Sequence, residues 1–367
     1  MTAAPSQEIL AANIVVPCAD LNQTLEFFLD TLGFRIEVIS PADHPTSAVI
    51  SGYGVRLRLL ATEKPTDPGP IELLVAHAGA SDLIAPNGTR VRFIDSTALT
   101  LPPVCQSLVV STMTGNATWG VGRASMHYRD LIPDRQGGRF IASHIRIPEG
   151  GPVPDYVHFH RIRFQMIYCY RGWVKVVYED QGEPFILEAG DCVLQPPQIR
   201  HRVLESSPGL EVIEIGCPAE HDTLAEHTIN LPTKEYLPNR DFGGQNFVRH
   251  QAPLANWQPW RHVGFEYRDL GMGVATHGLA GARVIRPIAL AAGVSSTPMS
   301  VIDNEFLFTF ILDGSATLRI SGRKDQTVVA GDSFVIPEAM AHSLVEVTND
   351  TEILEVSLPS ELVARPV

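Results

Sequence analysis

The residues most suited to chemistry lie in the stretch 157–172, which reads VHFHRIRFQMIYCYRG. Two of its histidines, His158 and His160, are separated by a single residue, and Gln165 follows them. A downstream stretch, GDCVLQPPQIRH, ends at a third histidine, His201. Because successive strand residues point to opposite faces of a sheet, the first two imidazoles would point the same way. The pattern therefore predicts a group of convergent imidazoles.

Three imidazole nitrogens and one side-chain oxygen form a ligand set that suits a divalent first-row metal. We expect one divalent transition metal per chain, held by His158, His160, Gln165 and His201. Gln165 offers only a neutral carbonyl oxygen, so it either ligates the metal or hydrogen-bonds a bound water or substrate. The ligand set leaves Fe(II), Mn(II), Ni(II) and Zn(II) open, because the affinity order alone does not select among them. No catalytic acid or base can be named from the sequence.

Length and composition limit the classes of function. A chain of 367 residues can hold two or three domains. Its 28 basic and 41 acidic residues give a net charge of −13 without a basic cluster, so nucleic acid is not an expected partner. No apolar run is long enough to cross a membrane, and the first residues lack a signal-peptide plan, so a cytoplasmic location is expected. The five cysteines form no CxxC motif and are expected to be reduced thiols.

The first part of the chain has the pattern of a small α+β domain over residues 8–95. Residues 12–17 form an apolar strand, and the following segment predicts a helix that Asp20 caps and Gly33 ends. Further strands are expected at 35–40, 47–52, 55–60, 71–76 and 89–93. Residues 96–120 are rich in Ser, Thr and Pro and are interpreted as a linker.

The remainder of the chain repeats itself, which predicts two copies of one module. The tetrad YRDL occurs at 128–131 and again at 267–270. His201 and His342 are 141 residues apart, and the same offset relates a larger set: Gly190, Asp191, Glu205, Glu211, Glu214, Pro218 and Glu220 match Gly331, Asp332, Glu346, Glu352, Glu355, Pro359 and Glu361.

Short strands punctuated by Gly and Pro favour a mainly β fold of jelly-roll type over a parallel α/β fold. We place the two copies at 121–218 and 257–362, with residues 219–256 connecting them.

The first copy resembles the cupin superfamily. Its two motifs are matched by Gly151, His158, His160, Gln165 and Gly172, and by Gly190, Pro196 and His201. Together with the repeat, the resemblance implies a bicupin protein with two jelly-roll barrels. It makes Fe(II) the preferred metal, although Gln165 stands where the family most often has Glu.

The second copy departs from the metal-binding motif. Counting back from Gly314 puts Ser300, Ile302 and Leu307 at the positions of the first copy's two HxH histidines and Gln165. Only His342 remains, and Glu305 lies two residues out of register, although at a strand end its side chain could still point inward. We therefore expect the second cupin to be metal-free and structural, with a metal-free ligand pocket as the alternative.

The N-terminal region resembles one module of the glyoxalase/bleomycin-resistance superfamily, also called vicinal oxygen chelate proteins. The resemblance covers VPCADLNQTLEFFLDTLGF and PNGTRVRFI. Asn13 stands about where that family often has a metal-binding His, and Glu72 could match an acidic ligand. Without a complete ligand set, we expect a structural, dimerising or regulatory module.

The expected function is that of a metal-dependent cupin oxidoreductase, a non-haem dioxygenase acting on a small oxygenated or aromatic substrate. The alternatives are a redox-neutral metal lyase, isomerase or hydrolase, and a non-enzymatic small-molecule-binding bicupin. Both resembled families imply a homodimer.

Strand alternation places Ile167 and Cys169 inside the first barrel and Tyr168 and Tyr170 on the opposite face. Candidates for shaping its pocket are Tyr168, Tyr170, Trp173, Arg146, Arg163, Gln195 and Arg200.

Overall fold

The computed structural model describes residues 9–77, 79, 81–96, 99–114, 118–288 and 294–367. The chain divides into two compact units, Met1–Ala98 and Leu99–Val367. In the part of the chain described, no helix is long and apolar enough to span a membrane.

The N-terminal unit has the α+β composition that the sequence predicts. Its first sheet has the order β1-β4-β3-β2, with β1 parallel to β4, and its second has the order β5-β7-β6. Asp20 caps the helix by accepting a hydrogen bond from the backbone N–H of Gln23 at 3.0 Å, as predicted. Phe28, on the helical segment, is fully buried in the core of this unit. The elements are β1 (Ile14–Cys18), α1 (Leu21–Glu26), the π-helical η1 (Phe27–Thr31), β2 (Arg35–Ser40), β3 (Ser47–Gly52), β4 (Val55–Ala61), β5 (Ile71–Val75), β6 (Leu83–Ile84) and β7 (Arg90–Asp95).

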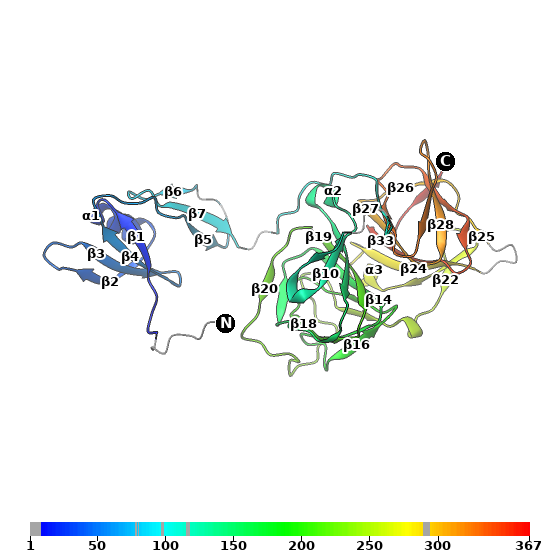
Figure 1. Ribbon diagram of the computed structural model, residues 1–367, viewed down its shortest axis with the longest axis horizontal. Helices are drawn as coiled ribbons and strands as arrows, with labels where there is room; N and C mark the ends of the chain where they lie inside the picture. Colours follow the sequence, from blue (N-terminus) through cyan, green and yellow to red (C-terminus); the bar gives the residue numbers. More distant parts are fainter. Residues whose placement is uncertain (1–8, 78, 80, 97–98, 115–117, 289–293) are drawn as a thin grey trace. The chain divides into compact units, whose positions relative to one another are not determined.

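The second unit contains two β-barrels, each built from two sheets (Figure 1). In the first barrel the sheets have the orders β21-β17-β14-β19-β11-β10-β9 and β16-β15-β18-β13-β20, with β12 beside β18. Its elements are β9 (Gly120–Val121), η2 (Arg123–Ser125), β10 (His127–Asp130), α2 (Arg135–Gly138), β11 (Ile141–Ile147), β12 (Gly151–Pro152), β13 (His158–His160), β14 (Phe164–Arg171), β15 (Trp173–Tyr178), β16 (Phe185–Glu188), β17 (Cys192–Leu194), β18 (His201–Ser206), β19 (Leu210–Cys217), β20 (Thr223–Ala225) and β21 (Val248–His250).

The second barrel repeats this plan. Its sheets have the orders β22-β23-β24-β33-β27-β30-β8 and β29-β28-β31-β26-β34, and β25 pairs with β32. Its elements are β8 (Val109–Ser111), η3 (Ala252–Leu254), β22 (Gln258–Pro259), β23 (Phe265–Asp269), α3 (Met272–Ala275), β24 (Gly281–Pro287), β25 (Val294–Ser295), β26 (Ser300–Ile302), β27 (Phe306–Asp313), β28 (Ser315–Ile320), β29 (Gln326–Val329), β30 (Ser333–Val335), β31 (His342–Val345), β32 (Val347–Thr348), β33 (Glu352–Leu358) and β34 (Ala364–Pro366).

Strand register supports the sequence alignment of the two copies. In the first barrel His158 of β13 is paired with His201 of β18. In the second, Ser300 of β26 is paired with His342 of β31. The same two strands therefore meet at the same residues in each barrel, and Ser300 occupies the place of a histidine.

Each barrel includes one strand from a segment that precedes the other barrel in the chain. Strand β8, from the stretch interpreted as a linker, pairs with β30 of the second barrel, and β21, from the inter-barrel connection, pairs with β17 of the first. The repeated tetrads take part in the same exchange. Arg129 donates to the carbonyl of Gly331 at 2.8 Å, and Arg268 donates to the carbonyl of Gly190 at 3.1 Å. These reciprocal contacts explain why both copies carry the tetrad.

An apolar core joins the barrels. Phe140 of the first barrel stacks on Phe306 of the second, with ring centroids 4.1 Å apart. Tyr168 and Tyr170 belong to this shared core, whereas Cys169 belongs to the interior of the first barrel. The predicted alternation of β14 is therefore confirmed.

Candidate metal centre

The structure brings together the three histidines that the sequence singles out. His158 and His160 come from β13 and His201 from β18, and one ring nitrogen of each lies within 4.8 Å of the others. All three side chains are buried, with exposed fractions of 1%, 8% and 4%. Within the residues that the structure describes, this is the only group of three or more His, Cys, Asp or Glu side chains close enough to share a metal.

Backbone carbonyls orient the three rings. The Nδ1 atoms lie 2.8 Å from the Tyr156 carbonyl, 3.3 Å from the Asp222 carbonyl and 3.0 Å from the Ile199 carbonyl, for His158, His160 and His201 in turn. A carbonyl oxygen can only accept a hydrogen bond, so each Nδ1 carries the proton. Each Nε2 is therefore left with a lone pair. This support of the ring is what metal-binding imidazoles receive in proteins, and the donor set fits a divalent transition metal.

Burial keeps the three imidazoles neutral. It lowers the pKa of His160 to about 3, with help from the neighbouring His158 and His221. Burial likewise lowers the pKa of His158, aided by the positive charge of Arg123, and lowers that of His201 well below its usual value. Because a metal binds only the neutral imidazole, the site is in its ligating form at neutral pH.

Gln165 lies in the same pocket and is held by Glu214, which the sequence analysis placed in the repeat but did not predict as a site residue. Its Nε2 donates to Oε1 of Glu214 at 2.6 Å, and both side chains line the pocket. The bond uses the amide nitrogen of Gln165, so its carbonyl oxygen keeps its capacity to face a metal, a water or a substrate. Glu214 adds a carboxylate to the site, which a general acid or base would require.

Arg123 is a second residue that the sequence analysis missed. Its Nη2 lies 3.2 Å from Nε2 of His158, and its Nη1 forms an ion pair with the buried carboxylate of Asp155. Asp155 also accepts a hydrogen bond from the backbone N–H of Val203 at 2.9 Å. A cation is thereby fixed at the edge of the histidine group.

The pocket beside the histidines has a volume of about 100 Å³. Its walls are mainly apolar, with polar groups gathered at the histidines. The lining residues are Arg123, Met126, Tyr128, Ile145, Ile147, His158, His160, Gln165, Ile167, Val174, Val176, Tyr178, Leu187, Gln195, His201, Val203, Leu210, Val212 and Glu214.

Of the predicted pocket-shaping residues, only Gln195 lines this pocket, where it donates to the hydroxyl of Tyr178 at 2.8 Å. The other six do not line it. Arg163 pairs with Glu305 at 2.8 Å, and Arg146 lies over the ring of Trp119. Cys169 is a buried thiol whose pKa is raised to about 12 by burial, in keeping with a core residue.

The second barrel has a small counterpart of this pocket, about 30 Å³ in volume and lined by Ser300, Ile302, Leu307 and His342 among others. There Arg261 binds both carboxylate oxygens of Glu355, at 2.8 Å and 2.5 Å. The suggestion that Glu305 could point inward is wrong. Its carboxylate instead binds Arg139 and Arg163 of the first barrel, and this ion pairing holds it outside the pocket.

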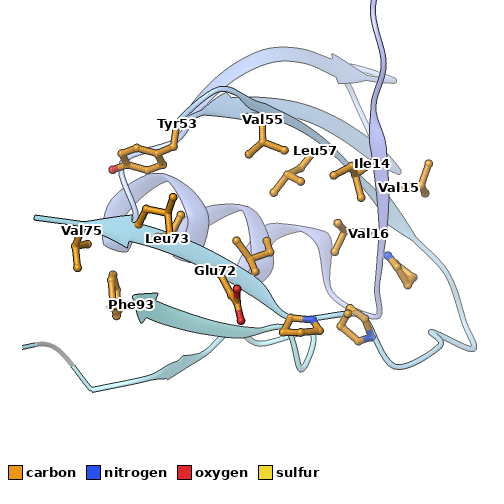
Figure 2. Close-up of a pocket in the computed structure, with 16 residues that line it drawn as sticks. Ile14, Val15, Val16, Tyr53, Val55, Leu57, Glu72, Leu73, Val75 and Phe93 are labelled. Carbon is orange, nitrogen blue, oxygen red and sulfur yellow. The ribbon is translucent and has the colours of Figure 1, made fainter. Parts of the chain in front are cut away.

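The N-terminal unit contains a larger groove, about 580 Å³ in volume (Figure 2). It is lined mostly by apolar side chains, including Ile14, Val16 and Phe93. Its one acidic residue, Glu72, lies 3.4 Å from Arg92, and Asn13 is exposed to solvent. Size alone therefore does not make this groove the chemical site, because its titratable groups do not converge.

Comparison with known proteins identifies similar folds but does not identify the activity. No protein-family model matches the chain, and no curated protein matches its sequence. A similar solved structure is the Lactobacillus farciminis oxalate decarboxylase–formate complex, with 14% identity and a TM-score of 0.52, covering 73% of this chain and 92% of that one. A mutant of Bacillus subtilis oxalate decarboxylase has 14% identity and a TM-score of 0.51, covering 74% and 82%. Protein Ylba from E. coli has 12% identity and a TM-score of 0.50, covering 71% and 95%.

At these identities the likeness concerns the fold alone. The chain has a bicupin fold, with two β-barrels and a three-histidine cluster in the first. Proteins with such a fold catalyse different reactions, so the function has to be inferred from the residues of the site.

Proposed function

We propose that the protein is a metal-dependent cupin enzyme, and specifically a non-haem dioxygenase acting on a small oxygenated or aromatic compound. The observation that carries the proposal is the buried group of His158, His160 and His201, in which each Nδ1 faces a backbone carbonyl and each Nε2 keeps its lone pair. Fe(II) is the preferred metal, with Mn(II), Ni(II) and Zn(II) as alternatives. When bound there, such a metal would polarise substrate oxygens and supply a redox centre.

The chain's own residues would bind and position the substrate. The apolar wall of the pocket, which includes Ile167 and Val212, would exclude water and contact a hydrocarbon body. The polar side chains of Gln165 and Glu214 lie on adjacent strands and would contact its oxygen atoms. A volume of about 100 Å³ favours a small substrate, since a cavity of about 150 Å³ is known to hold benzene.

Metal analysis combined with oxygen consumption tests the proposal. The full chain should contain about one transition metal, and the variant His158→Ala/His160→Ala should contain almost none. His342→Ala, in the second barrel, is the matched control and should keep the metal. A wild-type chain prepared without chelators that holds no metal would refute the metal site, and two metals per chain would refute the metal-free second barrel.

Glu214 favours a second candidate, a redox-neutral metal lyase or isomerase. Such an enzyme needs an acid or base beside the metal, and Glu214 places a carboxylate in the pocket. Two of the similar structures are oxalate decarboxylases, which supports this class of reaction. Turnover that continues at full rate without oxygen would exclude the dioxygenase and leave this candidate.

We further propose that the N-terminal unit is a glyoxalase-like module that helps the chain to form a homodimer. Edge strand β2 supports this idea because Ile36, Val38 and Ile39 are each at least 40% exposed. An apolar edge strand of this kind is a surface that another chain can cover.

A further inference from the structure

Two polar side chains, Tyr178 and Gln195, meet in the wall of the first-barrel pocket. Tyr178 ends β15 and Gln195 follows β17, and Nε2 of Gln195 donates to the Tyr178 hydroxyl at 2.8 Å. Both side chains are buried, with exposed fractions of 2% and 4%. Burying polar groups costs free energy even when they are paired with each other, so the fold gains little by keeping them.

The second barrel has an apolar side chain in place of the tyrosine. Tyr178 is paired in register with His201, and Ile320 of β28 is paired with His342 in the same way. Ile320 is 6% exposed and belongs to the apolar core of that barrel. An isoleucine therefore satisfies the fold at this position, and the hydroxyl is particular to the barrel that holds the three histidines.

The partner of the tyrosine is replaced in the same way. The backbone N–H of Gln195 donates to the carbonyl of Gln165 at 2.9 Å, and that of Ile336 donates to the carbonyl of Leu307 at 3.1 Å. Ile336 is 1% exposed and lies in the same core as Ile320. Both members of the polar pair thus have apolar counterparts in the second barrel, so the fold alone does not account for the pair.

The Tyr178 hydroxyl has a hydrogen bond left to donate. An amide nitrogen can only donate, so the bond from Gln195 occupies a lone pair of the hydroxyl oxygen and leaves the hydroxyl proton for another acceptor. Neighbouring rings fix the phenol, whose centroid lies 5.6 Å from that of His201 and 4.7 Å from that of Phe247. The tyrosine is therefore a preorganised donor in a pocket with mainly apolar walls.

We propose that Tyr178 is a substrate-binding residue whose hydroxyl, held by Gln195, donates a hydrogen bond to an uncharged carbonyl oxygen of the substrate. The inference rests on the proposed function in that it takes this pocket to be the active site. It adds a substrate class, namely a small apolar compound with a ketone-type oxygen. An uncharged acceptor fits best, because the Glu214 carboxylate lines the same pocket and would repel a second negative charge placed near it.

Infrared spectroscopy of a bound ketone tests this assignment. Cyclopentanone would be titrated into the full-length protein, as purified and after metal removal with a chelator, and its carbonyl stretching band recorded. A donated hydrogen bond lowers the frequency of this band. In the metal-free protein the Nε2 atoms of the three histidines are acceptors, so they cannot cause the shift. We expect a lowered band in the wild type. Tyr178→Phe should return the band to its value in hydrocarbon solvent and weaken binding by about 2- to 10-fold, the range for one neutral hydrogen bond.

Tyr128→Phe is the matched control. Tyr128 also lines the pocket, but it recurs in the second barrel as Tyr267, and its hydroxyl lies 3.7 Å from Sδ of Met126. This variant should keep both the lowered band and the affinity. Tyr178→Phe retains the stacked ring, which guards against misfolding. A second variant, Tyr178→Ile/Gln195→Ile, copies the second barrel and should also lose the lowered band while melting as one transition.

A wild-type protein that does not bind cyclopentanone, or that binds it without a lowered band after metal removal, overturns the inference. A lowered band that survives in Tyr178→Phe overturns it as well. If the lowered band depends on Tyr178 in a protein that takes up no metal, the proposed function fails and the role of Tyr178 stands. If metal is bound but the band does not depend on Tyr178, the proposed function stands and the inference fails.

Discussion

The buried histidines should make metal binding nearly independent of pH between 7.5 and 5. For three ordinary imidazoles with a pKa of 6.5, each must lose a proton at pH 5, which weakens binding by about 30-fold per histidine and roughly 3 × 10⁴-fold for three. In the metal-free protein, burial lowers the pKa of His160 to about 3 and lowers those of His158 and His201. Protons therefore compete little with the metal, and we expect a change of less than about 10-fold.

The same shifts cost the metal-free fold stability in acid. Below pH 6.5 these histidines are protonated in the unfolded chain but remain neutral in the folded chain. The free energy of unfolding therefore falls as the pH falls. At pH 5 the contribution of His160 alone is about 2 kcal/mol, from 1.5 pH units at 1.36 kcal/mol each. This loss continues down to about pH 3 for His160. Metal is therefore released by acid mainly when the barrel unfolds.

Chelator competition with Zn(II) from pH 7.5 to 5 measures the affinity, with the chelator calibrated at each pH and folding followed by circular dichroism. Potentiometry at pH 6 gives an independent reading. Ordinary histidines would release about two protons for each metal bound, and this site should release fewer than one. An affinity that falls with the third power of the proton concentration below pH 6.5, in protein that is still folded, would refute the reasoning.

Three other predictions concern single features. Arg261→Met should destabilise the chain by about 3 kcal/mol in urea unfolding, because it leaves Glu355 buried without its main partner. The double variant Arg261→Met/Glu355→Leu should recover most of that loss, and equal losses would contradict the argument. Glu214→Gln should lower kcat at least 100-fold while metal content is unchanged, if the redox-neutral reaction operates; an unaltered kcat excludes Glu214 as its acid or base. Light scattering should give the mass of a dimer, and a monomer at micromolar concentration would count against the proposed homodimer.

Much of the fold follows from local patterns in the chain. The helix cap at Asp20 and the bounds of β2 and β3 are as predicted, because capping and strand alternation depend on neighbouring residues. The second barrel follows from the repeat. The exchange of β8 and β21 does not, because pairing between distant strands leaves no mark in short apolar segments.

The residues of the candidate site also differ in whether a local sequence pattern predicts them. The three histidines carry a spacing that can be read, whereas Arg123 and Glu214 come from separate elements and have no motif around them. A signal did exist for both. Glu214 and Glu355 share the offset of 141 residues, and Arg123 and Arg261 follow a tryptophan at the same interval. Only the folded structure shows that these repeated residues meet in the pockets.

The strand exchange also sets the order in which the chain can be completed on the ribosome. Val109 of β8 is synthesised 226 residues before Val335, its partner in β30, so this strand must wait for nearly the whole second barrel. The first barrel is finished earlier, once β21 has emerged to cover β17. A nascent chain that stopped at residue 218 would display the apolar edge Cys192–Leu194, which invites pairing with other chains. The barrel that holds the three histidines therefore reaches its finished form only through the segment that leads into the second barrel.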